Sequence, residues 1–300
     1  MQDDNAGQGK ANFDHLYNKP DPREYFRVLA ELDYQIPQLA QPVFATLLAA
    51  REHQARHEHG RTVLDVCCSY GVNAALLRCD LSMADLVRHY REPSLAALSP
   101  AALVAADRSF YAEHRQANAP RIAGLDVATN AVEYGRRVGL LDDGAVENLE
   151  TQSPSAQLIE ALGDVGLVTS TGGVGYITER TFDGLLRVIP SRRRPWVAVF
   201  VLRMFSYERI TETLERHDLV TEELPETTFP QRRFASTHEQ DTTLAAVRAR
   251  GLDPTGREEQ GRFHACFYLS RPESEVAAVP LTELVSGLTF TAGAGNGRGS

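Results

Sequence analysis

The stretch Val63-Leu64-Asp65-Val66-Cys67-Cys68-Ser69-Tyr70-Gly71 carries the strongest indication of the fold. A short apolar run ends in an acid, a tight turn of mostly small residues follows, and residues 73–78 are typical of the start of a helix. Such a run is typical of a parallel strand that is buried on both faces. Small side chains let backbone N–H groups approach a ligand, and a helix N-terminus favours its carboxylate. The stretch therefore predicts a strand, a ligand-binding turn and a helix.

A second apolar run, Arg121-Ile122-Ala123-Gly124-Leu125-Asp126, also ends in an acid. An acid there can accept hydrogen bonds from both hydroxyls of a ribose. Ligands of doubly wound sheets lie beyond the carboxyl ends of the strands, so Asp65 and Asp126 are expected at one edge. Two structural alternatives need no ligand: Asp65 caps its turn, and Asp126 is the N-cap of the next helix.

Apolar runs alternate with helical patterns along the rest of the chain, which indicates an α/β fold with a doubly wound, mostly parallel sheet. The run Trp-Val-Ala-Val-Phe-Val-Leu at 196–202 is the strongest strand. Further strands are expected at 145–148, 165–169, 219–224 and 262–269, and further helices at 21–36, 39–57, 128–138, 180–189, 208–217 and 242–251.

The chain resembles the class I S-adenosylmethionine-dependent methyltransferases. Their motif Asp-x-Gly-x-Gly-x-Gly aligns with residues 65–71, where Asp65 and Gly71 match outright. Cys67 and Ser69 stand where the first two glycines usually are. Both are small, so a ligand can still approach closely, but we expect the turn to avoid the most strained positive-φ conformations.

The resemblance covers roughly residues 17–269 and implies a Rossmann-like fold with a sheet of seven strands. It also implies an enzyme that transfers a methyl group from S-adenosylmethionine to a small molecule. Asp126 matches the ribose-binding acid, Glu147-Asn148 the adenine contact, and residues 165–172 the place where methionine and substrate meet. The residues assigned to the cofactor are Tyr25, Asp65, Cys67, Ser69, Gly71, Asp126, Val127, Glu147, Asn148, Thr171 and Gly172. A NAD(P)-dependent oxidoreductase, whose G-x-G-x-x-G fingerprint is absent, and a catalytically silent cofactor-binding protein remain as alternatives.

Three candidate catalytic residues, Tyr176, Arg203 and His264, lie at or near predicted strand ends or active loops. No His–Asp pair stands out as a general base, which methyl transfer requires only when the acceptor arrives protonated. The guanidinium of Arg203 suits an anionic substrate, which favours an acidic acceptor such as a carboxylate. Oxygen and nitrogen acceptors both stay open. Cys67 and Cys68 are interpreted as small structural residues rather than nucleophiles.

We expect an N-terminal helical cap at 1–60, the methyltransferase domain at 61–270 and a partly disordered tail at 271–300. The helical insertion at 81–120 is expected to cover the substrate, to form a homodimer surface or only to pack. Segment 225–234 and an aromatic cluster are further candidates for the cover, although simple core packing explains the cluster equally well. That cluster consists of Tyr17, Arg23, Tyr25, Phe26 and Tyr34.

The net charge of −9 argues against a nucleic-acid partner, and the basic run at 192–194 is too short to change this. No apolar stretch reaches the roughly 18 residues of a membrane span, and the first ten residues lack a secretory signal pattern. The four cysteines (Cys67, Cys68, Cys79 and Cys266) match neither a zinc site nor a disulfide framework. A cytoplasmic protein with no metal is the simplest interpretation, with His53, His57 and His59 on an exposed helix end.

Overall fold

The computed structural model describes residues 14–54 and 62–289. Its centre is one eight-stranded sheet in the order β3-β2-β1-β4-β5-β8-β6, with β7 paired to β8 beside this path. The strands are β1 Thr62–Val66, β2 Arg121–Asp126, β3 Asp143–Val146, β4 Val165–Thr171, β5 Trp196–Leu202, β6 Leu219–Glu223, β7 Phe229–Arg233 and β8 Arg262–Pro272.

The α/β class and the mostly parallel sheet are confirmed, while the expected count of seven strands is too low by one. Strands β3, β2, β1, β4 and β5 pair in parallel, whereas β8 runs antiparallel to β5, β6 and β7. The additional strand is β7, which contains Pro230 and three polar residues. Proline removes a ladder hydrogen bond, so a sequence pattern with proline inside it argues against a strand.

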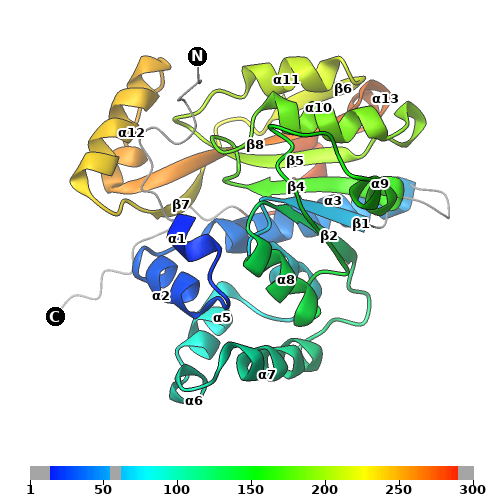
Figure 1. Cartoon of the computed structure of the whole chain (residues 1–300). Coiled ribbons are helices and arrows are strands. Elements are labelled where there is room, and N and C mark those ends of the chain that lie inside the picture. Colours follow the sequence, from blue (N-terminus) through cyan, green and yellow to red (C-terminus); the bar gives the residue numbers. More distant parts are fainter. Residues whose placement is uncertain (1–13, 55–61, 290–300) are drawn as a thin grey trace.

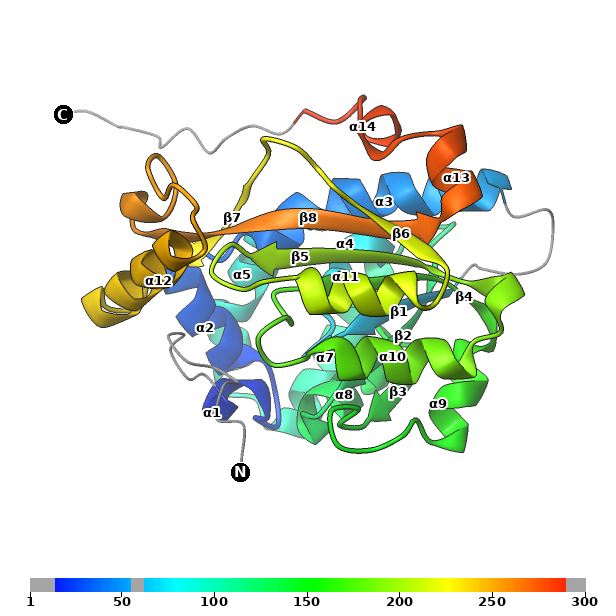
Figure 2. The same cartoon turned by 90° about the horizontal axis from the view of Figure 1, so that it is seen from above.

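Helices cover both faces of the sheet (Figures 1 and 2). Alternate residues of β5 belong to two separate cores: Trp196 and Phe200 to one, Val197 and Val199 to the other. The helices are α1 Asp14–Tyr17, α2 Arg23–Glu31, α3 Ile36–Gln54, α4 Val72–Arg78, α5 Met83–Tyr90, α6 Pro93–Ala96, α7 Pro100–Glu113, α8 Thr129–Arg137, α9 Ala156–Ala161, α10 Glu179–Val188, α11 Glu208–Glu215, α12 Thr237–Ala249, α13 Glu273–Ala278 and α14 Leu281–Leu284.

The segment 81–120 contains three helices, α5, α6 and α7. In the N-terminal region α3 begins at Ile36, so Pro37 lies in its first turn instead of ending a preceding helix. Proline is tolerated there because the first N–H groups of a helix lack intrahelical partners. The segment 271–300 begins with the end of β8, α13 and α14, and residues 290–300 lie outside the described part.

Within residues 14–54 and 62–289, no helix combines the length and apolar character needed to cross a membrane. His57 and His59 lie outside the described residues, as does the side chain of His53.

Candidate functional site

The turn between β1 and α4 has an unusual backbone. Cys67, Ser69 and Gly71 have φ values of 61°, 48° and 78°, so all three lie in the left-handed region. The turn is tied to the end of β2, because the N–H groups of Cys67 and Cys68 both donate to the carbonyl oxygen of Leu125, at 2.8 and 3.3 Å. The left-handed region is the small positive-φ region open to residues other than glycine. The turn thus keeps a positive φ without glycine at two positions.

Two glycines on neighbouring strands and loops make room for the thiols of this turn. A Cβ atom on Gly124 of β2 would lie 2.7 Å from Cys68 Sγ, and one on Gly173 would lie 2.9 Å from Cys67 Sγ. Both distances are too short for real side-chain contacts. The cysteines therefore fill space that the backbone of these glycines leaves open, which agrees with their interpretation as structural residues.

Asp126 ends β2 and holds this turn from the other side. Its Oδ2 accepts a hydrogen bond from the N–H of Ser69 at 2.8 Å, and its Oδ1 accepts one from the N–H of Ala128 at 2.9 Å. Burial raises the pKa of this carboxyl group. Each carboxylate oxygen has a second acceptor position, and Asp126 lines the cavity described below. The backbone N–H of Val127 also interacts with this carboxylate. The side chain can therefore still accept a further hydrogen bond from a ligand. The N-cap of α8 is Ala128, not Asp126.

Asp65 lies deeper, at the end of β1. Its Oδ1 accepts hydrogen bonds from Asn73 Nδ2 and Thr169 Oγ1, both at 3.0 Å, while its buried Oδ2 has no hydrogen-bond partner. Burial raises the pKa of Asp65 to about 7. Asn73 also donates to Thr171 Oγ1 at 3.0 Å, and both of these residues line the cavity. Asp65 itself does not line it, so it orients residues that do.

These strand ends open into a cavity of about 350 Å³. Its walls come from the β1–α4 turn, the end of β2, the loop after β4, strand β7 and the N-terminal region. The lining residues are Tyr17, Asn18, Tyr25, Leu29, Tyr34, Pro37, Cys67, Cys68, Ser69, Val72, Asn73, Asp126, Val127, Ala128, Thr171, Gly172, Gly173, Tyr176, Gln231 and Arg232. Nine of the fourteen residues that the sequence assigned to the site lie together here: Tyr25, Cys67, Ser69, Asp126, Val127, Thr171, Gly172 and Tyr176 on the walls, and Asp65 behind them.

Tyrosines dominate the N-terminal wall. The rings of Tyr17 and Tyr25 meet edge to face with centroids 5.8 Å apart. The hydroxyl of Tyr34 hydrogen bonds with those of Tyr25 and Thr171, and burial raises the pKa of Tyr34 to about 12. Three members of the predicted aromatic cluster thus line the cavity, while Phe26 stacks on Tyr90. The wall is uncharged at neutral pH.

Arg232 is the one cationic side chain among the described lining residues, and it is paired. Its Nη1 and Nη2 atoms donate to the two carboxylate oxygens of buried Glu239, at 2.9 and 2.7 Å. Beside it, Gln231 packs against Gly172, where a Cβ atom would lie 2.2 Å from Gln231 Nε2. The cavity wall therefore offers no guanidinium that lacks a carboxylate partner.

Several residues that the sequence assigned to the site lie elsewhere. Arg203 and His264 are outside the cavity lining, and the Arg203 guanidinium contacts Glu258 at 2.5 Å. Glu147 accepts hydrogen bonds from the N–H and hydroxyl of Ser155 at the start of α9. Asn148 lies outside the lining as well, and its Oδ1 accepts from the N–H of Glu150. Gly71 serves as the N-cap of α4.

Sequence reasoning missed Asn73, Gln231 and Arg232 as individual site residues. Asn73 follows the motif turn and lies in the first turn of α4. Its position directly after the motif could therefore have identified it as a site residue. Gln231 and Arg232 reach the cavity only because β7 pairs with β8, where Pro230 lies opposite His264. This long-range pairing has no local sequence signal. Within the described ranges no three His, Cys, Asp or Glu side chains are grouped so that they could hold a metal ion.

Comparisons with known proteins give matches only among solved structures. No family model and no curated protein matches the chain. The plantazolicin methyltransferase BpumL in complex with SAH is 9% identical, with 85% of this chain and 92% of that chain covered and a TM-score of 0.40. Magnesium protoporphyrin IX methyltransferase from Synechocystis PCC 6803 with bound SAM is 9% identical (78% and 80% covered, TM-score 0.37). The [4+2]-cyclase SpnF is 12% identical (76% and 80% covered, TM-score 0.35).

Proposed function

We propose that this protein binds S-adenosylmethionine in the cavity and transfers its methyl group to a small-molecule acceptor. The observation that carries the proposal is Asp126. Two backbone N–H groups fix its carboxylate at the end of β2, and its remaining acceptor positions are available to a ligand in the cavity. A carboxylate held in this way suits the two neighbouring hydroxyls of a ribose.

The residues around Asp126 fit the rest of a nucleoside with an amino-acid tail. Val127 is 62% exposed although it is a large apolar residue, and it lines the cavity next to Ala128. An adenine ring packed there would remove this apolar surface from water. On the other side of Asp126, the hydroxyl oxygen of Ser69 is buried without a hydrogen-bond partner. We place the methionine part of the cofactor beside this turn, at the N-terminus of α4.

The charge of the cavity favours a cationic sulfonium over a dinucleotide. A pyrophosphate carries two negative charges, and the only cation among the described lining residues is already paired with Glu239. Tyrosine faces attract a cation through their ring quadrupoles, and four tyrosines line this cavity. In addition, the usual strand order of dinucleotide-binding sheets is 3-2-1-4-5-6, whereas here the antiparallel β8 lies between β5 and β6.

When bound, S-adenosylmethionine supplies an electrophilic methyl group, so the protein mainly needs to align the acceptor with it. Arg203, the residue that suggested an acidic acceptor, does not line the cavity. Tyr34 stays protonated at neutral pH because its pKa is raised to about 12. Among the described lining residues, Asp126 is the only carboxylate, and we assign its open acceptor positions to the ribose. We therefore favour an acceptor whose nucleophilic atom arrives already deprotonated, such as a carboxylate.

Calorimetric titration with S-adenosylmethionine, S-adenosylhomocysteine and NAD⁺ tests the cofactor. The proposal requires one molecule of S-adenosylhomocysteine per chain and no heat from NAD⁺ at the same concentrations. Binding of NAD⁺ alone would instead support an oxidoreductase. A catalytically silent binding protein would bind S-adenosylhomocysteine but transfer no radiolabelled methyl group to any member of a library of small carboxylic acids, phenols and amines.

A further inference from the structure

The helical insertion does not form a wall of the cavity. The described lining residues include none from 81–120. Instead, α5 packs against α2 (Figure 1). From here on, the cap means residues 14–34, a part of the N-terminal region that the sequence assigned to a cap at 1–60. The cap does line the cavity, through Tyr17, Asn18, Tyr25, Leu29 and Tyr34. The insertion therefore lies behind the cap, and its contacts with the cap indicate what it does.

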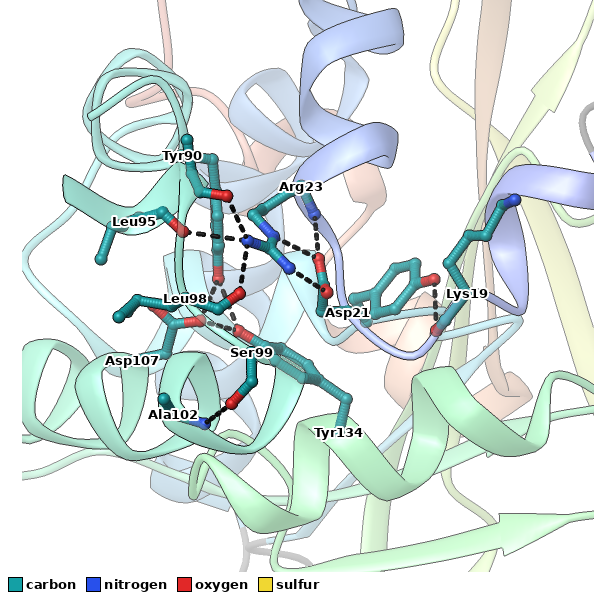
Figure 3. Close-up of polar contacts among 12 residues, drawn as sticks. Lys19, Asp21, Arg23, Tyr90, Leu95, Leu98, Ser99, Ala102, Asp107 and Tyr134 are labelled. Carbon is teal, nitrogen blue, oxygen red and sulfur yellow. Dashed lines mark hydrogen bonds and ion pairs between the residues drawn. The ribbon is translucent and has the colours of Figure 1, made fainter. Parts of the chain in front are cut away.

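Arg23, the first residue of α2, joins the cap to the insertion (Figure 3). Its Nη1 lies within hydrogen-bond distance of three carbonyl oxygens at the end of α6, those of Leu95, Ala96 and Leu98, at 2.9, 3.1 and 3.0 Å. The two protons of Nη1 are shared among these three oxygens. Its Nε and Nη2 donate to the carboxylate of Asp21 at 2.9 and 2.7 Å. Carbonyl oxygens at a helix end lack intrahelical partners, and the guanidinium offers donors to those of Ala96 and Leu98. It shares the Leu95 carbonyl oxygen with the N–H of Leu98.

The surface that receives the cap is held rigidly. Phe26 of the cap stacks on Tyr90 of α5, with ring centroids 4.4 Å apart and an angle of 11° between the rings. The Tyr90 hydroxyl contacts that of Tyr134 on α8 at 2.7 Å, and Tyr134 donates to fully buried Asp107 of α7. His89 contacts the same carboxylate at 2.6 Å. This network fastens α5 and α7 to the core, so the docking surface does not have to move with the cap.

On its inner side the cap is held by fewer contacts. The Tyr70 hydroxyl lies 3.0 Å from the carbonyl oxygens of both Leu16 and Lys19, and its single proton serves one of them at a time. Asn18 accepts two hydrogen bonds from Asn130, one from its N–H and one from its side-chain amide, at an exposed site. The contacts of Arg23 are thus the most extensive polar connection of residues 14–30 of the cap, and they are partly open to water. Residues 31–34, at the other end of the cap, are tied to β7 and β8 by Arg233 and Arg262.

We propose that the insertion forms the surface on which the cap docks, and that Arg23, held in place by Asp21, controls how often the cap opens. We call this set of contacts the latch. The frequency of opening in turn sets how fast the cavity ligand exchanges. Segments open locally where water can reach the hydrogen bonds that hold them, as it can at Arg23. Only the identity of the ligand rests on the proposed function. Opening of the cap can be measured without any ligand.

Hydrogen exchange of the ligand-free protein, followed by mass spectrometry, tests the latch. Arg23→Ala should raise the exchange rate of peptides from 24–31 about tenfold and leave α3, α7 and β5 unchanged. Arg27→Ala is the matched control, because Arg27 lies on the same helix, has a side chain that is 60% exposed and pairs only with Glu31, at 3.5 Å. Its exchange should equal that of the wild type. Arg23→Lys, which keeps the charge but loses the fork of donors, should lie between wild type and Arg23→Ala.

The ligand step is tested by the dissociation rate of S-adenosylhomocysteine, which should rise about tenfold in Arg23→Ala and stay unchanged in Arg27→Ala. Unchanged exchange at 24–31 in Arg23→Ala overturns the latch, and so does faster exchange spread over α7 and β5. Faster exchange confined to the cap with an unchanged dissociation rate overturns the link to ligand exchange. If the wild type binds no S-adenosylhomocysteine, the proposed function fails, whereas the exchange result still decides whether the insertion docks the cap.

Discussion

Two ends of the same sheet edge carry charged residues, and only one of them faces the cavity. At the β1–β2 end, Asp126 holds two backbone N–H groups and keeps acceptor positions open to the cavity. At the β5–β8 end, the Arg203 guanidinium donates to Glu258 and to the carbonyl oxygen of Asp253, and His264 pairs with Thr228. The difference shows that a place at a strand end does not make a side chain available. The partners that surround it decide this.

The pKa values of the titratable side chains also differ between the two ends of the sheet edge. At the β5–β8 end, burial followed by the charge of Arg203 lowers the pKa of His264 to about 4, so the imidazole is neutral at pH 7. Neutral His264 and the paired Arg203 and Glu258 form a structural cluster. At the β1–β2 end, burial raises the pKa values of both Asp65 and Asp126. Perturbed pKa values of this kind are common at functional sites.

The largest effect is expected from Arg203→Leu, which leaves the buried carboxylate of Glu258 without its partner. Removing one member of a buried ion pair costs about 3–5 kcal/mol of unfolding free energy. Urea unfolding measures this loss, and calorimetry should find the affinity for S-adenosylhomocysteine unchanged. Arg248→Ala, which breaks an exposed pair with Glu259, is the control and should cost less than about 1 kcal/mol. If folded Arg203→Leu binds S-adenosylhomocysteine more weakly than the wild type, Arg203 contributes to the cofactor site after all.

Asp65 should make stability depend on pH. Its pKa in the folded state, about 7, lies above the usual value of 3.8, so the folded state holds the proton more tightly. The stabilisation is complete below about pH 4 and is lost as the pH rises through 7. The unfolding free energy of the wild type should therefore fall relative to Asp65→Asn by on the order of 4 kcal/mol between pH 4 and 8. Parallel pH profiles of the two proteins would show that Asp65 titrates normally.

Asp126→Ala should weaken binding of S-adenosylhomocysteine by about 2–4 kcal/mol, because charge-assisted hydrogen bonds to the ribose are lost. Calorimetry of the folded variant measures this. Glu147→Gln is the matched control, since Glu147 was also assigned to the cofactor but contacts Ser155 instead. Its affinity should stay within about twofold, or about 0.4 kcal/mol, of the wild type. Equal affinities of Asp126→Ala and the wild type would exclude our placement of the ribose.

The smallest effect is expected at Ser69. Ser69→Gly relieves a positive φ of 48° and removes a buried hydroxyl without a partner, so the free energy of unfolding should rise by about 1 kcal/mol. Ser69→Ala removes the hydroxyl but keeps the strain. Urea titrations of the two variants separate these contributions. If Ser69→Gly is the less stable variant, the strain in the turn is not a cost to the folded state.

The first half of the site was predictable because it is local. A strand, an acid and a turn of small residues follow one another at 62–71, and Asp126 ends the next strand in the same way. The second half depends on tertiary pairing. Strand β7 brings Gln231 and Arg232 to the cavity from 160 residues beyond the turn, and its proline hides it from strand patterns. Likewise, no local pattern shows that Arg203 would find Glu258, 55 residues later.

The position of β8 has a consequence for the order in which the protein can be made. Residues 262–272 are synthesised after every other strand, yet they lie between β5 and β6 and also pair with β7. A ribosome that has not yet reached this segment therefore carries a nascent chain whose β5 is unpaired on one side and whose β6 has no partner strand. Unpaired strand edges of this kind invite pairing with other chains. We expect products truncated before residue 262 to aggregate during translation, while the β1–β2 end of the sheet can already be complete.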